Sequence, residues 1–380
     1  MRVAESLAGV AAGEWNALCG GDPFTRHEFL SALIETGCAS GRTGWQPQFL
    51  LLERGGRLAA AMPLYLKSHS YGEYVFDWAW ADAYERHGLA YYPKLLAAVP
   101  FTPVTGPRLL AAQDADRAAL VAAALELARE VSSLHVLFAT AQEAALMQAA
   151  GMMLRRTVQF HWQNAGYADF EDFLSRMTRA RRKNIRQERR RVREAGIACR
   201  WLRGAEIGRR DWERFERCYR RTYAAHRSRP YLSLEFFLRL GEVLPQHLLM
   251  VLAERAGRPI AASLCVLAGE ALCGRYWGAL EHVPLLHFEC CYYQPIEYAI
   301  AHRLARFEGG AQGEHKLWRG LMPVRTHSAH WLRHPGFANA VEDYLRRESA
   351  GLARYVDELD EHSPFKPAAP YNPDFSRGTA

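Results

Sequence analysis

Two stretches of the chain resemble each other: ERGGRLAAAMPL at residues 53–64 and ERAGRPIAASLCVL at residues 254–267. An apolar run precedes each of them, FLLL in the first case and LMVLA in the second. A short turn containing glycine between two apolar segments is typical of a β-hairpin. Each stretch therefore predicts a pair of antiparallel strands.

The segments upstream of the two hairpins also correspond. HEFLSALI, from His27, resembles LEFFLRLG, from Leu234, and an earlier helical segment carries Trp15 in one half and Trp212 in the other. The order helix, helix, strand, turn, strand thus occurs twice. A repeat of this kind predicts two copies of one α/β unit, which we expect at residues 1–167 and 197–380.

Residues 168–196 separate the copies and predict a basic helical connector. The segment 176–193, RMTRARRKNIRQERRRVR, holds ten Lys and Arg residues and a single acidic residue, Glu188, in a chain whose net charge is only +7. Asp169 suits the N-cap of this helix and Gly196 suits its end. IACRWLRG then predicts the first strand of the second copy.

The connector allows two interpretations. Charge runs are commonly solubilising surfaces, and they also bind polyanions such as RNA or an anionic membrane surface. No aromatic residue lies between the arginines, so an RNA contact would be to phosphate rather than to stacked bases. The candidate polyanion-binding residues are Arg182, Lys183, Arg186, Arg189, Arg190 and Arg193.

Composition limits the class of protein. Hydrophobic residues make up 49% of the 380 residues, enough for a large core. The eight cysteines include no CxxC pair, the amino terminus lacks a signal-peptide pattern, and no apolar run reaches the roughly 20 residues that span a bilayer. We expect a cytoplasmic protein with reduced thiols and no transmembrane segment.

The stretch GGAQGEHKLWRG at residues 309–320 concentrates polar and charged residues. RFEGGA matches a pyrophosphate-loop pattern, but the glycines are expected to follow a helix and precede a strand, the reverse of a phosphate cradle. The histidines at 315, 327, 330 and 334 fit no zinc spacing, so we expect no metal. The adjacent Cys290 and Cys291 are more typical of a buried core than of a nucleophile.

Acid–base chemistry fits the second half best. Acyl transfer to an amine needs a base, oxyanion donors and an acid for the leaving group. We expect the base to be Glu289 or His315 and the proton donor to be Tyr292 or Tyr293. The candidate substrate-binding residues of this half are Gln294, Glu314, Lys316 and Arg319. A structural polar network at the same positions is the alternative.

The helix that carries several of these residues has two alternative starts. It begins at Pro295 with Gln294 as its cap, or it begins near His287 and is kinked at Pro295.

The first half contains a second dense cluster, YVFDWAWADAYERHGLAYYPKL, at residues 74–95. Aromatic walls with interspersed charges line many concave sites, although aromatic core loops look the same in sequence. The candidate substrate-binding residues here are Asp77, Trp80, Tyr91, Tyr92 and Lys94.

Three segments resemble one known family. They are YVFDWAWADAYERHGLAYYPKLLAAVPFTPVTGPRLL, GRYWGALEHVPLLHFECCYYQPIEYAI and GGAQGEHKLWRGLMPVRTHSAHW. They are similar to the predicted N-acyltransferases of peptidoglycan biosynthesis or recognition, a FemAB-like branch of the GNAT superfamily. The resemblance implies tandem GNAT-like domains of α/β (α+β) class. It also implies an acyl or aminoacyl donor, and an amine acceptor such as a peptidoglycan precursor.

The resemblance leaves the donor open. Fem-type enzymes take aminoacyl-tRNA and carry a basic helical element, which the connector resembles, whereas acyl-CoA relatives use a pyrophosphate loop that neither half shows. We expect no tightly bound cofactor. The alternatives are an acyl-CoA-dependent N-acetyltransferase, or a muropeptide- or nucleic-acid-binding module without catalysis on the same fold.

Overall fold

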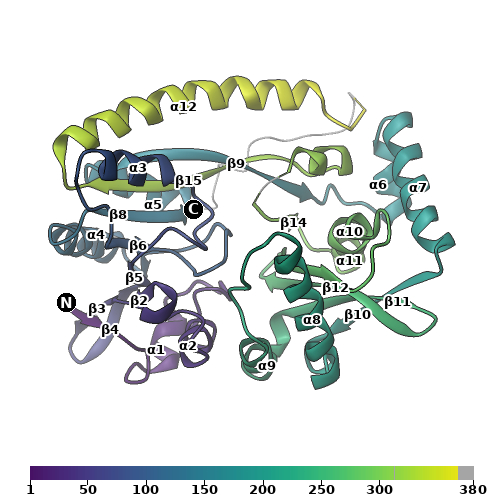
Figure 1. Cartoon of the computed structure of the whole chain (residues 1–380), viewed down its shortest axis with the longest axis horizontal. Coiled ribbons are helices and arrows are strands. Elements are labelled where there is room, and N and C mark those ends of the chain that lie inside the picture. The colour runs from purple at the N-terminus through teal and green to yellow at the C-terminus, as the bar shows by residue number, and fades with distance from the viewer. Residues whose placement is uncertain (312, 367–380) are drawn as a thin grey trace. The chain divides into compact units, whose positions relative to one another are not determined.

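The computed structural model describes residues 1–311 and 313–366 (Figure 1). Its chain passes repeatedly between two units. Unit 1 consists of Met1–Val158, Tyr231–Val243 and Arg325–Arg354. Unit 2 consists of Gln159–Pro230, Leu244–Val324 and the chain from Tyr355 to the last described residue.

This division differs from the predicted boundaries of 1–167, 168–196 and 197–380. Residues 231–243 and 325–354 were expected in the second copy, but they belong to unit 1. The reason is that they contact elements of the first half of the chain, which lie far from them in sequence. Helix α9 (Leu234–Val243) packs on α2 (His27–Glu35), with the rings of Phe29 and Phe236 5.9 Å apart. Strand β15 (Met322–Leu332) pairs with β8 (Ser133–Ala139). Residues 367–380 of the predicted second domain lie outside the described residues.

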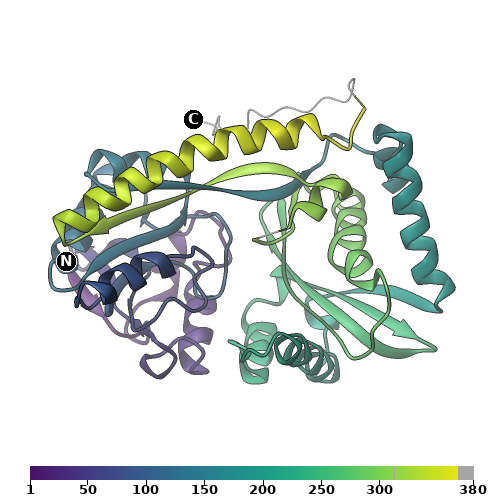
Figure 2. The same cartoon turned by 45° about the horizontal axis from the view of Figure 1, so that its top comes forward.

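Unit 1 contains the four-stranded sheet β1-β3-β4-β7 and the strands β2-β5-β6-β8-β15-β9 of an eleven-stranded sheet. The strands that begin in this unit are β1 (Arg2–Ala4), β2 (Trp45–Pro47), β3 (Phe49–Arg54), β4 (Arg57–Met62), β5 (Leu64–Lys67), β6 (Lys94–Ala97), β7 (Leu110–Ala111), β8 and β9 (Met153–Gln163). Its helices, besides α2 and α9, are α1 (Ala12–Ala17), η1 (Gly41–Thr43), α3 (Trp78–Arg86), α4 (Asp114–Ala128), α5 (Ala141–Ala149) and most of α12 (Pro335–Glu361), the long helix in Figure 2.

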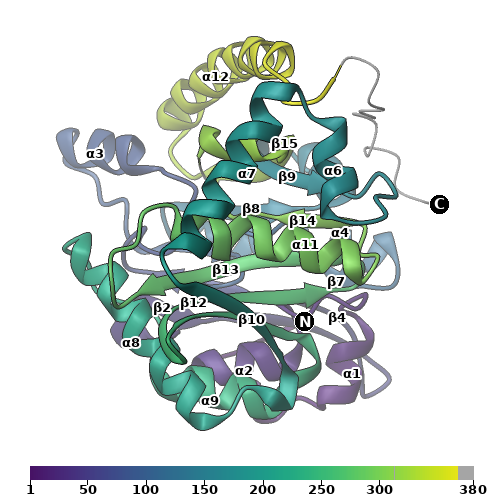
Figure 3. The same ribbon diagram turned by 90° about the vertical axis from the view of Figure 1, so that its right-hand side faces the viewer.

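Unit 2 contains the strands β10-β11-β12-β13-β14-β9 of the eleven-stranded sheet (Figure 3). Strands β9 and β15 each run from one unit into the other, so the two copies are not separate along the chain. The remaining strands are β10 (Ile197–Arg203), β11 (Leu248–Arg255), β12 (Arg258–Ala268), β13 (Ala271–Ala279) and β14 (Arg306–Glu308). The helices are α6 (Phe170–Arg176), α7 (Arg179–Glu194), η2 (Gly204–Glu206), α8 (Arg209–Ala225), η3 (Pro245–His247), α10 (Leu286–Phe288), η4 (Glu289–Tyr293), α11 (Gln294–Ala301) and η5 (Glu314–Arg319).

The two predicted hairpins are confirmed, and they share details that the sequence did not show. Strands β3 and β4 are joined by Gly55 and Gly56, and strands β11 and β12 by Ala256 and Gly257. All four turn residues have positive φ, as a type I′ turn requires. The strand register shifts immediately before Glu53 in one hairpin and immediately before Glu254 in the other. A β-bulge at the same place in both copies supports the repeat.

The preceding helices also match. Trp15 on α1 and Trp212 on α8 are both buried, and a first strand, β1 or β10, pairs antiparallel with the first strand of the hairpin, β3 or β11. The predicted strand at IACRWLRG is β10, confirming that expectation.

The basic connector is two helices rather than one. Asp169 caps α6 as predicted, since its side chain accepts a hydrogen bond from the backbone N–H of Asp172 at 2.8 Å. Met177 is extended and forms a bridge with Phe365, which ends α6, and α7 then runs to the predicted stop at Gly196, where φ is +75°.

The segment before α11 follows the second of the two alternatives. Helical structure begins at Leu286, and Pro295 follows a π-helical turn, η4. Because proline has no N–H to donate, a widened turn before it avoids a broken α-helical bond, and such π-bulges often mark functional sites. Within the described residues, no helix is both long enough and apolar enough to cross a membrane.

The expected order around the glycines at 309 and 310 is wrong. They follow strand β14 and lead to the 3₁₀ helix η5, instead of following a helix and preceding a strand. The described residues of this loop still do not form a phosphate cradle, because the Gly309 N–H already donates to the Phe160 carbonyl and η5 is only six residues long.

Candidate acid–base site

In unit 2, the two polar windows of the second half come together at η4 and η5. The hydroxyl of Tyr292, on η4, lies 3.1 Å from Nε2 of His315, on η5. Tyr292 is buried and His315 is partly exposed. This pair joins one predicted proton donor to one predicted base.

Burial sets the protonation states of this pair. Desolvation, followed by the nearby Arg319 and Lys316 cations, lowers the pKa of His315, and desolvation raises the pKa of the Tyr292 phenol. The imidazole is therefore neutral and the phenol protonated at neutral pH, as general base catalysis with a phenol donor requires. His287 lies nearby and burial lowers its pKa to about 4, so it is neutral as well.

Gly313 leaves room for Nδ1 of His315, the ring nitrogen that does not face Tyr292. Its φ of +118° is open to glycine alone, and a Cβ at this position would lie 2.4 Å from Cε1 and 2.9 Å from Nδ1 of His315. Any other residue would clash with this edge of the imidazole. Gly313 itself therefore places no side chain over Nδ1.

Lys316 brings a buried cation to the same place. Its Nζ donates to the Gly310 carbonyl at 2.8 Å, and it makes no ion pair with the described residues. Desolvation lowers the pKa of this lysine to about 8. An ammonium group has three donors, so Lys316 retains capacity for an anionic partner.

Tyr293, the other predicted proton donor, has a partner on α7. Its hydroxyl donates a very short hydrogen bond to Glu188. Arg319 Nη2 donates to both oxygens of that carboxylate, at 3.0 and 3.1 Å, and its guanidinium lies 3.4 Å from the ring centre of Phe288. Tyr293 and Arg319 are thus parts of a buried ion-pair network.

Glu289, the other predicted base, is engaged in a salt bridge. Arg189 Nη2 lies 2.9 Å from Glu289 and 2.6 Å from Glu297. Gln294 Nε2 also donates to Glu289 at 2.8 Å, and its own oxygen accepts from Trp201. These bonds occupy the Glu289 carboxylate, so the geometry favours His315 as the base.

Glu314 forms its hydrogen bond with a residue outside this group. It is exposed and accepts a 2.7 Å hydrogen bond from the Tyr355 hydroxyl. Among the described residues, no hydrogen bond or ion pair joins Glu314 to Tyr292 or to the His315 ring.

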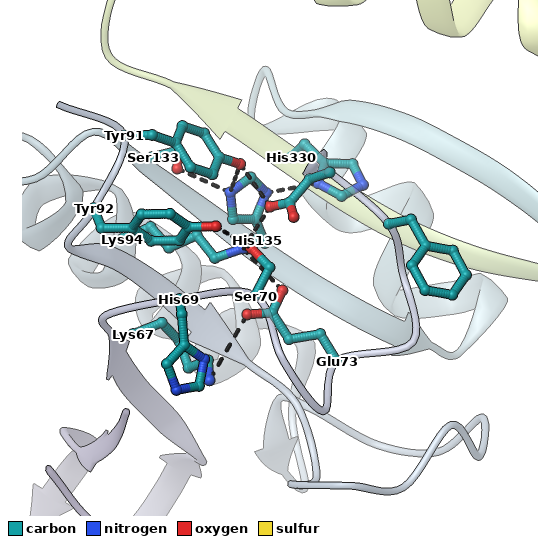
Figure 4. Close-up of polar contacts among 12 residues, drawn as sticks. Lys67, His69, Ser70, Glu73, Tyr91, Tyr92, Lys94, Ser133, His135 and His330 are labelled. Atoms are coloured by element: carbon teal, nitrogen blue, oxygen red, sulfur yellow. Dashed lines mark hydrogen bonds and ion pairs between the residues drawn. The ribbon is translucent and has the colours of Figure 1, made fainter. Parts of the chain in front are cut away.

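In unit 1, the predicted substrate-binding residues form a buried network (Figure 4). Lys94, on β6, is fully buried, and its Nζ donates to Ser70 at 2.7 Å, to Glu73 at 2.8 Å and to Asp77. The Tyr91 hydroxyl donates to Asp77 at 2.6 Å and lies 3.1 Å from His135 Nε2. The side chains of this network thus bind one another.

Further contacts extend this network to the neighbouring side chains. Tyr92 and Ser70 hydroxyls lie 2.8 Å apart, and His135 Nδ1 lies 2.7 Å from His330 Nδ1, so one of the two imidazoles donates to the other. Trp80 packs against His330 with ring centres 5.0 Å apart. Lys67 reaches Glu73 at 3.9 Å and lies 3.8 Å from the Trp45 ring centre.

Charges in this network compensate one another. The two buried lysines face two buried carboxylates. Burial and the Lys94 cation act in opposite directions on Asp77, and its pKa is lowered. Desolvation raises the pKa of Glu73 to about 7 and lowers that of Lys67 to about 7. Burial lowers the pKa of His135 to about 3, so it is neutral.

Several members of this network were not predicted. They are Lys67, Ser70, Glu73, Ser133, His135 and His330. They come from β5, the loop after it, β8 and β15, and only the pairing of these strands brings them together. No motif in the sequence could have grouped them.

The basic helix α7 has two different faces. Ile185, Val192 and Arg189 point into the unit, which corrects the grouping of Arg189 with the surface cations. The opposite side forms a hollow of about 650 Å³. It is lined by Glu171, Arg179, Arg182, Lys183, Arg186, Gln187, Arg190 and Arg193. We call these residues the cationic groove.

Two other chemistries find no support in the described part of the chain. It contains no group of three His, Cys, Asp or Glu side chains placed to hold a metal ion. Burial raises the pKa of the Cys290 and Cys291 thiols well above the ordinary value, which disfavours the reactive thiolate.

Solved structures resemble the fold at low sequence identity. FemX aligns with a TM-score of 0.54 at 11% identity, over 88% of this chain and 98% of that chain. The L-PGS structure from Bacillus licheniformis aligns with a TM-score of 0.53 at 8% identity, over 90% and 97%. These similarities confirm the predicted class of fold. No curated protein matches the sequence.

One family model covers nearly the whole chain. It matches residues 6–367 and is described as peptidoglycan biosynthesis/recognition. The family predicted from the three sequence motifs is therefore confirmed: the chain belongs to the FemAB-like family.

Proposed function

We propose that this protein is an N-acyltransferase that transfers an acyl or aminoacyl group to an amine, with its chemistry at the Tyr292–His315 pair of unit 2. The observation that carries the proposal is the hydrogen bond between a protonated phenol and a neutral imidazole. The FemAB-like family and the FemX-like fold support a transferase of this class.

The pair can accept a proton from the attacking amine and donate one to the leaving group, as the reaction needs. His315 Nδ1 takes a proton from the attacking amine while the new C–N bond forms. The proton on Nε2 passes to the Tyr292 oxygen, and the Tyr292 proton passes to the leaving oxygen or sulfur as the ester or thioester bond breaks. Protons balance, because one enters at Nδ1 and one leaves from the phenol.

Lys316 would bind an anionic part of a substrate. Its ammonium group is buried, and among the described residues its one hydrogen-bond acceptor is the Gly310 carbonyl. A substrate carboxylate or phosphate would supply the missing countercharge. The family description supports a peptidoglycan precursor as the source of the acceptor amine.

The cationic groove favours an RNA-borne donor. From Arg179 to Arg193 the helix rises about 21 Å, with a cation on nearly every turn of the outward face. Such a row can neutralise several phosphates of a charged tRNA, which would place the reaction in the cytoplasm. An acyl-CoA donor is the second candidate, and it would depend less on this groove because it carries few phosphates.

The proposed chemistry is tested with His315→Asn. Loss of a general base lowers turnover by about 10²- to 10⁴-fold, so we expect a decrease of that size in kcat with labelled donor and an amine acceptor. His334→Asn is the matched control, because His334 is exposed and belongs to unit 1. Equal kcat in the two variants would refute the assignment of His315.

The donor is tested with charge removal from the groove. Four glutamines replace Arg182, Lys183, Arg190 and Arg193. The matched control removes four exposed arginines elsewhere, Arg209, Arg220, Arg346 and Arg347. With charged tRNA as donor, activity of the groove variant should fall and its salt dependence flatten by roughly 0.7 to 0.9 log units per lost phosphate contact. Unchanged tRNA-dependent activity, or saturable turnover with acetyl-CoA in both variants, would favour the CoA donor.

A further inference from the structure

Glu188 is the one acidic residue among the ten cations of residues 176–193. It does not pair with the arginines that surround it in sequence. Its carboxylate points into unit 2, where it accepts hydrogen bonds from Tyr293 of η4 and Arg319 of η5. A single acid on a cationic helix thus reaches both halves of the candidate site.

On the η5 side, the interaction of Glu188 reaches His315 through Arg319. Arg319 uses Nη2 for Glu188 and Nη1 for the backbone carbonyl of His315, at 2.7 Å. The guanidinium also lies on the ring of Phe288, which in turn faces the His315 imidazole with ring centres 5.7 Å apart. Fixing the guanidinium therefore fixes the main chain of the candidate base.

On the η4 side, the interaction of Glu188 reaches Tyr292 through Tyr293. The hydroxyl of Tyr293 binds Glu188, and Tyr293 directly follows Tyr292 in the π-helical turn. Both tyrosines are buried, so neither ring has much freedom to move. The same carboxylate therefore restrains the chain on each side of the Tyr292–His315 hydrogen bond.

We propose that Glu188 is a positioning residue that sets the geometry of the Tyr292–His315 pair from helix α7. It acts through Arg319 on His315 and through Tyr293 on Tyr292, and it does not touch the reacting atoms. This inference rests on the proposed function for its effect on turnover. Its effect on the geometry of the pair can be measured without turnover.

The test compares truncations of two glutamates on the same helix. Glu188→Ala removes the inward carboxylate, while Glu194→Ala removes an exposed one that pairs with Arg190. A displacement of the reacting groups by about 1 Å can cost about 10²-fold in rate. We expect kcat to fall about 10- to 100-fold in Glu188→Ala, with little change in KM, and to stay unchanged in Glu194→Ala.

Glu188→Gln tests whether the effect is more than a loss of folding. Glutamine keeps an acceptor for Arg319, so this variant should recover part of the lost kcat. The titration of the His315 ring, followed by NMR, gives a second measurement that is independent of activity. Burial and the Arg319 and Lys316 cations lower the pKa of His315 in the folded protein, and this pKa should change in Glu188→Ala because Arg319 loses its carboxylate partner.

Each outcome has a distinct meaning. A shifted His315 titration with reduced kcat in Glu188→Ala, and neither change in Glu194→Ala, supports the inference. If the two truncations leave the same titration and the same kcat, Glu188 does not position the pair. If His315→Asn retains full activity while the titration still shifts in Glu188→Ala, the proposed function fails and the positioning of the ring stands.

Discussion

The two units carry polar clusters of similar density, but their charges are balanced differently. In unit 1, Lys94 and Lys67 face Glu73 and Asp77, and Lys94 alone has three side-chain acceptors. In unit 2, two cations act on His315: Arg319 pairs with Glu188, while Lys316 has no ion-pair partner among the described residues. A cluster that compensates its own charge is suited to stability, and one with a cation in excess is suited to an anionic ligand.

Removing the central lysine of unit 1 should produce the largest effect on stability. Lys94→Met leaves two buried carboxylates without their main partner, and breaking a buried pair in this way costs about 3 to 5 kcal/mol. Urea denaturation followed by tryptophan fluorescence measures the loss.

Lys316→Met in unit 2 is the matching variant. It removes a buried cation that has no ion-pair partner among the described residues, so the free energy of unfolding should stay unchanged or rise. Equal destabilisation by the two substitutions would contradict the contrast between the clusters.

Gly313→Ala should damage unit 2 without removing any polar group. The added Cβ would lie 2.4 Å from the His315 ring, and φ at +118° is closed to alanine, so the loop must move and carry the imidazole with it. We expect kcat to fall about 10- to 100-fold, as for a misplaced catalytic group. Gly351→Ala is the control, since nothing lies within 4 Å of a Cβ there. Normal turnover in Gly313→Ala would show that the position of His315 is unimportant.

The pH dependence of kcat/KM should have two limbs. His315 must be neutral to accept a proton, so activity is present above its lowered pKa and is lost as the pH falls through it. Lys316 must be charged to bind an anion, so activity is lost as the pH rises through about 8. Rate profiles between pH 5 and 10 show both limbs. Lys316→Arg, which keeps its charge, should remove the alkaline limb, and a limb that persists in this variant would exclude Lys316 as its source.

Local patterns predicted the elements well and the long-range pairings poorly. Glycine turns, the Asp169 cap and the stop at Gly196 depend on a few neighbouring residues, and all of them are found in the structure. The domain boundaries depend on α9 packing against α2 and on β15 pairing with β8, which no local pattern encodes.

The same limit applies to the candidate site. The windows around Tyr292 and His315 could be identified because each is dense in sequence. Glu188 was noted only as the exception in a basic run, His330 was considered only as a metal ligand, and His135 was missed entirely. Their partners are set by strand pairing and helix packing rather than by neighbours in the sequence.

The smallest predicted effect concerns the two hairpins, whose turns differ at one equivalent position. Ala256 in unit 2 has φ of +49°, and Gly55 occupies the same place in unit 1 with φ of +57°. A left-handed conformation costs a residue with a side chain about 1 to 2 kcal/mol, while glycine loses about 0.5 to 1 kcal/mol through its greater freedom when unfolded. Ala256→Gly should therefore stabilise the protein by up to about 1 kcal/mol, and Gly55→Ala should destabilise it by a similar amount. Since nothing lies within 4 Å of a Cβ at Gly55, steric clash cannot account for that loss. Urea denaturation measures the free energy of unfolding of both variants. Changes of the same sign would show that backbone strain does not distinguish the two turns.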